Sequence, residues 1–307
     1  MKLGVNYLSV TMKQVAGSWL SDAPHSLQPQ GLAITTLGAY GRVRGEPVWS
    51  GGMVRLLGEF GFSVGAARVA LGRLVRSGLL ERVRRGRQIY YGMSPALEHL
   101  LAEGDERIFG LGVDDDWTGV WTVLWQAVPD ELGLQRRRLA GRLRFLGFGP
   151  VQNGTWVSPH DRARELTALV DDLAIEQHVG VIVGRPATGN ALQTLIGQAW
   201  DLDALASGYE RFLDELRPFR SARARGRLSD RDAFVVRTRA VHDFRHFPSQ
   251  DPGLPEVVLN RRWRRGDAVA AFRELYELLA EPAQRHFDQA MAGDRRGIRA
   301  RPAAARL

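Results

Sequence analysis

Two helical patterns separated by only a few residues lie within residues 53–78, and this pairing constrains the fold more than any other feature of the chain. The apolar positions of the first pattern, "GMVRLLGEFGF", recur on one helical face: Met53, Leu56, Leu57 and Phe60. Gly61 is expected to end this helix. The second pattern, "SVGAARVALGRLVRSG", has Ser63 as an N-cap and Gly78 as a C-cap. The sequence therefore predicts two helices joined by a tight turn.

The second of these helices separates into two faces. Its inward positions are apolar or small: Ala67, Leu71, Leu74 and Val75. On another side Arg68, Gly72 and Arg76 recur every four residues, and Arg73 lies beside them. Gly65, Ala66 and Ala70 are small. They keep the helix slim enough to enter a DNA major groove.

Shorter elements flank the helix pair. Before it, "LAITTLGAYG" predicts a helix stopped by Gly41, then an extended piece at Val48–Trp49 and a possible cap at Ser50. After it, "LLERVRRGRQIYYGM" predicts two short strands around a tight turn at Arg85–Gly86. One of the two tyrosines after the turn is expected to pack beneath the hairpin and the other to face outward. The order matches a winged helix-turn-helix.

Positive charge is concentrated in this same region. The chain of 307 residues has a net charge of +8 and a pI near 10.4. Between Gly31 and Pro95 ten arginines stand against three glutamates, which gives 10 − 3 = +7. An arginine stripe on its own is more often a solvated helix face. Here a helix pair, a basic helix and a basic hairpin follow one another, and together they indicate binding to double-stranded DNA.

Composition excludes several classes of protein. With 44% apolar and 25% charged residues the chain is typical of globular proteins, and no apolar run is long enough to span a membrane. The absence of cysteine excludes disulfides and thiolate chemistry. The N-terminal residues lack a continuous apolar segment of the signal-peptide kind. A cytoplasmic protein without a membrane partner is expected.

The rest of the chain alternates strands and helices and then becomes helical. "WTGVWTVLWQAVP", "GTWVSP" and "HVGVIVG" read as strands, and two helical patterns separate them, which predicts a small ferredoxin-like domain. The fold class is α+β. The expected ranges are 1–30 for a flexible N-terminal arm, 31–97 for the winged helix-turn-helix, 98–116 for a connector containing the acidic run Asp114–Asp116, 117–198 for the ferredoxin-like middle domain, 199–290 for a helical C-terminal domain and 291–307 for a disordered tail.

Catalytic and metal-binding motifs are missing. The sequence has no HExxH, GxSxG, Walker or GxGxxG motif, and no nucleophile–base pair is visible, so neither an enzyme nor a cofactor is expected. His242 and His246 are four residues apart, but such pairs are common and a third ligand is not evident, so a metal site is disfavoured. Arg136–Arg138 and Arg142–Arg144 form a second basic patch that faces DNA, an acidic ligand or solvent. Trp200 reads better as a buried anchor before an Asp201 cap than as a pocket wall.

Several segments resemble one known family. The run from "TTLGAYGRVRGEP" to "RQIYYGMSP", and the later "WDLDALASGYERFL", "HDFRHFPSQDPGLP" and "FRELYELLAEPA", are similar in order to the PaaX family of repressors of phenylacetate catabolism. The resemblance covers about Ile34 to Phe287. It implies an operator-binding winged helix-turn-helix, a ferredoxin-like middle domain and a helical C-terminal domain that forms a homodimer and binds an effector. The implied effector is a small aromatic ligand or an aryl-CoA thioester that releases the repressor from DNA.

Two alternative functions are a metal-dependent nuclease and an enzyme that acts on a small molecule. The middle domain resembles small CRISPR-associated nucleases, which would make the chain a metal-dependent nuclease. Those nucleases have an acidic residue at the end of the first strand, where this chain has Gln126 and Ala127, and that departure argues against cleavage. The other alternative, an enzyme acting on a small molecule, lacks visible catalytic residues. Neither explains why the charge is concentrated in the first domain.

The expected partners are a double-stranded operator with an inverted repeat, an aromatic or aryl-CoA effector and a second copy of the chain. Residues expected to contact DNA are Ser63, Arg68, Gly72, Arg73, Arg76, Arg82, Arg84, Arg85 and Arg87. Residues taken as candidates for the effector site are Arg138, Arg142, Trp200, His242 and Arg245.

Overall fold

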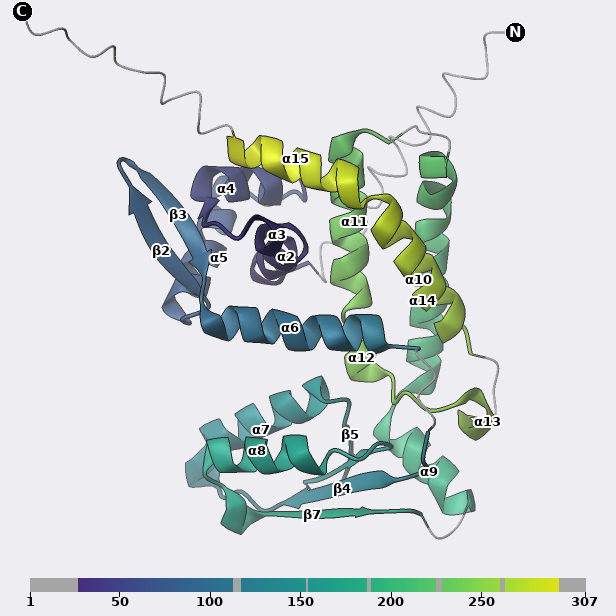
Figure 1. The fold of residues 1–307 in the computed structure, drawn as a ribbon. Coiled ribbons are helices and arrows are strands. Elements are labelled where there is room, and N and C mark those ends of the chain that lie inside the picture. Colours follow the sequence, from purple (N-terminus) through teal and green to yellow (C-terminus); the bar gives the residue numbers. More distant parts are fainter. Residues whose placement is uncertain are drawn as a thin grey trace, which may run out of the picture. The chain divides into compact units, whose positions relative to one another are not determined.

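The computed structural model describes residues 27–112, 117–152, 154–186, 189–224, 228–259 and 263–292 (Figure 1). Most of the expected N-terminal arm, the acidic run Asp114–Asp116 and nearly all of the expected tail lie outside these residues. The described part mixes helices with two small antiparallel sheets, which confirms the α+β class. No helix within it is both long and apolar enough to cross a membrane.

The chain divides into two compact units. The first comprises Met1–Gly104, Asp214–His242 and Ala271–Leu307, and the second comprises Asp105–Leu213 and Asp243–Ala270. Helices α10 (Leu202–Ala224), α11 (Asp230–Phe244) and α14 (Arg265–Leu278) contribute residues to both. The first unit thus combines the segment expected to bind DNA with parts of the C-terminal helical region.

The first unit begins with a helix that is longer than predicted. Helix α2 (Pro29–Thr36) continues through a π-helical turn η1 (Leu37–Gly41) into α3 (Arg42–Arg44). The prediction that Gly41 stops the helix was wrong, because its backbone is helical with φ −68°. The helix ends instead at Gly45, whose φ of +63° is left-handed and suits glycine.

The predicted helix pair is confirmed. Helix α4 (Ser50–Gly58) and helix α5 (Val64–Arg76) are joined at Gly61, where φ is +85°. The four apolar positions predicted to face inward are all buried: Met53, Leu56 and Leu57 lie on α4, and Phe60 lies in the turn after it. The possible cap at Ser50 was wrong, since Trp49 occupies the N-cap and makes no side-chain cap bond.

A three-stranded antiparallel sheet completes the basic region. Its order is β1 (Val48–Trp49), β3 (Gln88–Met93), β2 (Leu80–Arg85). Arg85 pairs with Gln88, so the turn is Gly86–Arg87, one residue later than predicted. Gly86 takes the left-handed conformation the turn requires, with φ +61°. The two tyrosines of β3, Tyr90 and Tyr91, are both half-buried.

Tyr40 joins this region to C-terminal helices of the same unit. Its side chain is fully buried, and its ring packs against Phe234 of α11 and Phe287 of α15 (Ala280–Ala292). The phenol oxygen lies 3.0 Å from Oγ1 of Thr238. Burial raises the pKa of Tyr40, so the group stays a protonated hydrogen-bonding phenol. Arg237 lies over the Tyr40 ring and over the ring of Tyr276 on α14.

Helix α15 packs directly on α4. The backbone carbonyl of Ala290 accepts a hydrogen bond from the Arg55 guanidinium. A Cβ at Gly52 would lie 2.8 Å from that same carbonyl oxygen, so the close approach of the two helices requires glycine there. His286 Nε2 lies 2.8 Å from Glu59 Oε1 at the other end of α4. Helix α6 (Pro95–Gly110), which follows the hairpin, occupies most of the expected connector.

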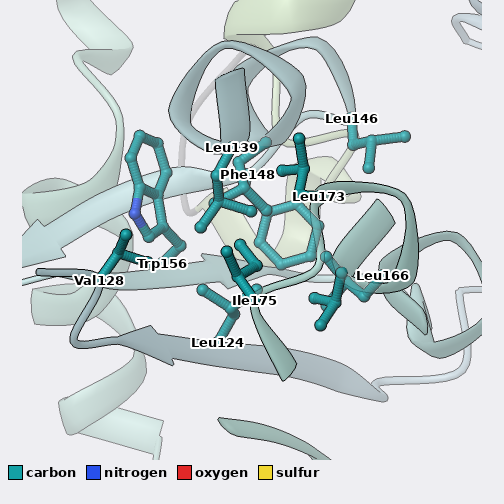
Figure 2. Close-up of a cluster of buried hydrophobic side chains, with 11 residues drawn as sticks. Leu124, Val128, Leu139, Leu146, Phe148, Trp156, Leu166, Leu173 and Ile175 are labelled. Atoms are coloured by element: carbon teal, nitrogen blue, oxygen red, sulfur yellow. The ribbon is translucent and has the colours of Figure 1, made fainter. Parts of the chain in front are cut away.

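The second unit is built on a four-stranded antiparallel sheet. Its strands are β4 (Trp121–Gln126), β5 (Gly149–Gln152), β6 (Thr155–Ser158) and β7 (Val179–Gly184), in the order β5-β6-β4-β7. Strand β5 was not predicted. Helices α7 (Gly133–Phe145) and α8 (Ala163–Leu173) cover one face of the sheet. Their apolar side chains meet those of the strands in a buried cluster that contains Leu124, Leu139, Phe148, Trp156 and Leu166 (Figure 2).

Helices α9 (Gly189–Ala199), α12 (Phe247–Gln250) and α13 (Glu256–Leu259) and the first part of α10 belong to the same unit. A buried carboxylate, Asp251, organises this part. It accepts hydrogen bonds from the Tyr209 hydroxyl at 2.7 Å and the Trp263 indole at 3.3 Å. Its other oxygen accepts from Arg265 at 2.9 Å. Burial, and then the adjacent carboxylate, raise the pKa of Tyr209 far above its usual value, so the phenol remains a donor.

We expect replacement of Asp251 by alanine to destabilise the protein by about 3–5 kcal/mol, because it leaves Arg265 and the Tyr209 hydroxyl buried without their acceptor. The matched control is Asp130→Ala, which removes an exposed carboxylate that pairs with Arg136 at 2.8 Å and should cost at most about 1 kcal/mol. Urea unfolding monitored by circular dichroism measures both. Equal losses for the two variants would contradict the role assigned to Asp251.

Candidate nucleic-acid interface

Helix α5 carries an exposed basic face. Ala67, Leu71 and Leu74 are buried, and Val75, which was expected to face inward with them, is half-buried. The side chains of Arg68, Arg73 and Arg76 are exposed, and Gly72 is half-exposed between them. This division confirms the predicted separation of the helix into an apolar and a basic face.

Ser63 defines where this helix begins. Its Oγ accepts a hydrogen bond from the backbone N–H of Ala66 at 3.2 Å, and its φ and ψ of −64° and 155° are those of an N-cap residue. At the other end, Gly78 has φ +74° directly after the C-cap Ser77. The predicted N-cap is therefore confirmed, whereas the C-cap is Ser77 and the predicted Gly78 is the left-handed residue that follows it.

The basic hairpin, residues 80–93, displays four more exposed arginines: Arg82, Arg84, Arg85 and Arg87. Two of them are oriented locally. Arg84 Nε donates to the carbonyl of Gly86 at 3.1 Å, and the Arg85 guanidinium lies 5.0 Å from the centre of the Tyr90 ring. The Tyr90 hydroxyl in turn donates to Gln88 Oε1 at 3.1 Å. Tyr90 therefore contacts Arg85 on the neighbouring strand and Gln88 on its own strand.

Two other arginines of the basic region form contacts within the protein. Arg44 pairs with Asp288 at 3.0 Å, and Arg55 bonds the backbone of α15 and lies over Trp49. By contrast, no acidic side chain within the described ranges pairs with any member of a set that we name the arginine surface: Arg68, Arg73, Arg76, Arg82, Arg84, Arg85 and Arg87. These seven charges are left for an external anion.

The candidate effector residues lie on separate elements. Arg138 on α7 is exposed, and Arg142 on the same helix lies over the Phe145 ring at 4.8 Å. Arg245 follows α11 and has its pKa lowered, chiefly by burial. His242 belongs to the first unit, where its Nδ1 lies 3.2 Å from Thr35 Oγ1. The described contacts do not gather these residues into one site.

Trp200 is the candidate with the most informative surroundings. It precedes α10, whose N-terminus is capped by Asp201 accepting from the Ala204 N–H at 2.9 Å, as predicted. Its ring is buried and lies 6.3 Å from the ring of Trp121 on β4. The indole nitrogens of both tryptophans are buried without a hydrogen-bond partner among the described residues. Composition signals could not reveal this pair, since the two residues are far apart in the chain.

The two histidines spaced four residues apart, His242 and His246, do not lie on one helix. Helix α11 ends at Phe244, so His246 lies beyond the helix that carries His242. Burial, and secondarily the charge of Arg245, lower the pKa of His246. Across the described part of the chain, histidine and acidic side chains form no group of three or more that could hold a metal ion.

Comparison with family models finds three matches in sequence order. Residues 28–97 match a model described as PaaX-like protein, residues 114–196 match the PaaX protein central Cas2-like domain, and residues 200–289 match the PaaX-like protein C-terminal domain. Together they span nearly the whole described region.

Individual relatives agree with these matches. The chain is 26% identical over 248 residues to the transcriptional repressor PaaX of Escherichia coli, covering 78% of this chain and 77% of that protein. The uncharacterized protein Rv0674 from Mycobacterium tuberculosis has a similar structure, with a TM-score of 0.51 and 23% identity over 83% of this chain and 96% of the other. The structural likeness shows a shared fold.

We expect Ser63→Ala to lower the free energy of unfolding by about 1 kcal/mol, because the Ala66 N–H loses its acceptor at the start of α5. Ser63→Asp should restore stability, since aspartate caps equally well. Ser77→Ala is the matched control at the other end of α5, where the hydroxyl only donates to the Leu74 carbonyl. Thermal unfolding measures all three, and a loss with Ser77→Ala as large as with Ser63→Ala would argue against the cap.

Proposed function

The chain belongs to the PaaX family, and from that premise we propose that it is a DNA-binding transcriptional repressor of an aromatic-compound catabolic operon, with phenylacetate as the family's default pathway. The observation that carries the proposal is the arginine surface. Its seven charges sit on two consecutive elements, α5 and the basic hairpin, and no described acidic side chain neutralises them. Binding to DNA phosphates, the task of a transcription regulator and not of a metabolic enzyme, explains a surface of unpaired arginines.

We infer that residues 31–97 form a winged helix-turn-helix. Helices α4 and α5 with the turn at Gly61 supply the helix pair, and β2 and β3 supply the wing. In this arrangement α5 enters the major groove, where Arg68, Arg73 and Arg76 reach base edges or phosphates. The wing arginines hold the backbone or an adjoining minor groove. Ser63 places the positive end of α5 where a phosphate can approach.

For the second unit we infer a ferredoxin-like domain with a structural role. Supporting features are the β-α-β-β-α-β order and the strand order β5-β6-β4-β7, with two helices on one face. Gln126 ends β4, and its side-chain oxygen accepts from the Val128 N–H at 3.1 Å. A nuclease of the kind considered above would need an acidic residue there. Incubation of the protein with labelled duplex and Mg²⁺ tests that alternative, because cleavage would establish it.

We infer a homodimer because the family resemblance implies one, and a dimer in turn implies an operator with an inverted repeat. Two copies related by a two-fold axis would place two α5 helices on half-sites one helical turn of DNA or a multiple of it apart. Light scattering of the protein with and without duplex measures the stoichiometry. A single copy on each operator would overturn the dimer.

We place the effector site in the second unit, near Trp200. Two buried indole N–H groups without described partners are donors that an acceptor-bearing ligand can satisfy. Both rings are buried, so an aryl group that enters this place would pack on aromatic side chains. Arg138, Arg142 and Arg245 belong to the same unit and carry positive charge suited to the phosphates of CoA. The His242 ring contacts Thr35 in the first unit, so His242 is the candidate with the least support as an effector residue.

Replacing the four hairpin arginines by glutamine should weaken DNA binding and flatten its salt dependence. Each phosphate contact contributes about 0.9 to the slope of log K against log salt, so the slope should fall by up to about 3.6. The change should be similar on operator and unrelated duplex, since phosphate contacts carry no sequence information. Fluorescence anisotropy across a salt series measures it.

The control for this experiment removes the same charge elsewhere. Arg164, Arg211, Arg217 and Arg264 are exposed arginines outside residues 31–97. Their replacement by glutamine should leave the slope within error of the original. A slope unchanged by the hairpin variant, or changed equally by both variants, would overturn the assignment of the hairpin.

Phenylacetyl-CoA, used as a probe of the aryl-CoA class, should raise the Tm and lower the affinity for the operator. A ligand present at a hundred times its Kd stabilises the state it binds by about 2.7 kcal/mol. Trp200→Phe should weaken ligand binding while leaving DNA affinity unchanged. Trp156→Phe, at a buried tryptophan of the hydrophobic cluster, controls for lost packing. Equal ligand affinity in the original protein and in Trp200→Phe would remove Trp200 from the site.

A further inference from the structure

The exposed face of α5 contains apolar residues that the fold does not use. Val64 and Val69 are 53% and 52% exposed, although valine is neither a strong helix former nor suited to solvent. The four buried residues of this helix are Ala67, Ala70, Leu71 and Leu74. Both valines are therefore exposed beside arginines: Val64 lies at the flank of the exposed face one turn before Arg68, and Val69 lies one turn before Arg73.

Two glycines run along the middle of the same face. With 3.6 residues per turn, Gly65 and Gly72 lie one above the other at its centre. Val64 and Arg68 flank them on one side, and Val69 and Arg73 on the other. Glycine in a helix interior is unfavourable relative to alanine, so each glycine needs a reason.

Packing within the described protein does not supply that reason. A Cβ at Gly65 would come no closer than 3.9 Å to Ser63 Oγ, and one at Gly72 no closer than 3.8 Å to Arg76 Nη1. Neither residue has a positive φ. Alanine would therefore fit at both positions and favour the helix. What the glycines provide is a strip of bare backbone that an external surface can approach closely.

In the major groove, that surface is a row of base edges. Thymine is the one base that presents a methyl group there, and apolar side chains contact it. Resting on the function proposed above, we propose that Val64 and Val69 contact the 5-methyl groups of operator thymines, and that Gly65 and Gly72 allow α5 to sit deep enough for them to do so. The arginines beside each valine then reach neighbouring guanines or phosphates.

Deoxyuridine gives a direct test, because it lacks the methyl group of thymine and keeps its hydrogen bonds. A duplex is first selected on the original protein from a randomised library, and its thymines are then replaced singly. Loss of each contacted methyl should weaken binding about fourfold. Val69→Ala should bind the thymine duplex correspondingly less well and lose nothing further at one uridine position, and Val64→Ala should behave likewise at another. Val43→Ala, at a valine of α3 that is 75% exposed, is the matched control and should leave both affinities unchanged.

The glycines are tested by a change that separates folding from binding. Gly72→Ala should raise the Tm by about 1–3 °C, because alanine is the better helix former. It should nevertheless weaken binding to the selected duplex by about fivefold or more, which is the effect of one mismatched base pair. Gly104→Ala, in helix α6 with open space around its Cβ position, should raise the Tm without changing affinity.

The outcomes separate this inference from the function on which it rests. If no duplex is selected and the arginine variants change nothing, DNA binding itself is wrong. If the arginine variants weaken binding while uridine is tolerated everywhere, or if the valine variants remain equally sensitive to uridine, the thymine contacts are overturned and the repressor assignment stands. Unchanged affinity in Gly72→Ala would overturn the close approach.

Discussion

The buried ring of Tyr40 is the contact on which the first unit depends. It lies in a helix of the basic region, yet its neighbours Phe234, Thr238 and Phe287 come from the C-terminal third of the chain. Arg237 lies over the same ring and that of Tyr276, so a buried cation is held between two aromatic faces. The helices that present α4 and α5 thus share one core with α11, α14 and α15. The segment proposed to bind DNA is therefore packed against these C-terminal helices.

Charge is distributed within this unit in a way that separates support from binding. Arg44 and Arg55, near the α15 contact, are bonded to protein groups, and Glu59 is paired with His286. The seven members of the arginine surface pair with no acidic side chain among the described residues, although they are close together in the chain and repel one another. That repulsion costs stability. On the proposed function, the phosphates of bound DNA supply the missing anions.

Much of the local structure could be predicted from the sequence, because local signals decide it. Ser63 and Gly61 fix the start of α5 and the turn before it, and the spacing of Met53, Leu56 and Leu57 fixes the buried face of α4. The failures have tertiary causes. The helix runs past Gly41 because the burial of Tyr40 fixes that turn. The short strand β5 exists through its pairing with β6. Trp121 packs near Trp200, and α15 packs on α4. The sequence indicates that such residues are buried, but it does not indicate which distant residues they contact.

The proposed division of DNA contacts, with phosphates bound by the hairpin and bases by α5, determines which residues must change for the protein to recognise a different operator. Phosphate contacts supply affinity without sequence information, so the four hairpin arginines can serve any site. On the proposed function, discrimination between operators comes from the exposed face of α5, which carries three arginines, two valines and two glycines. Glycines have no side chain to read a base, and the N-cap serine is committed to the backbone. In the proposed complex, a change of operator would therefore involve the exposed side chains of α5, namely Val64, Arg68, Val69, Arg73 and Arg76, and would leave the core around Tyr40 unchanged.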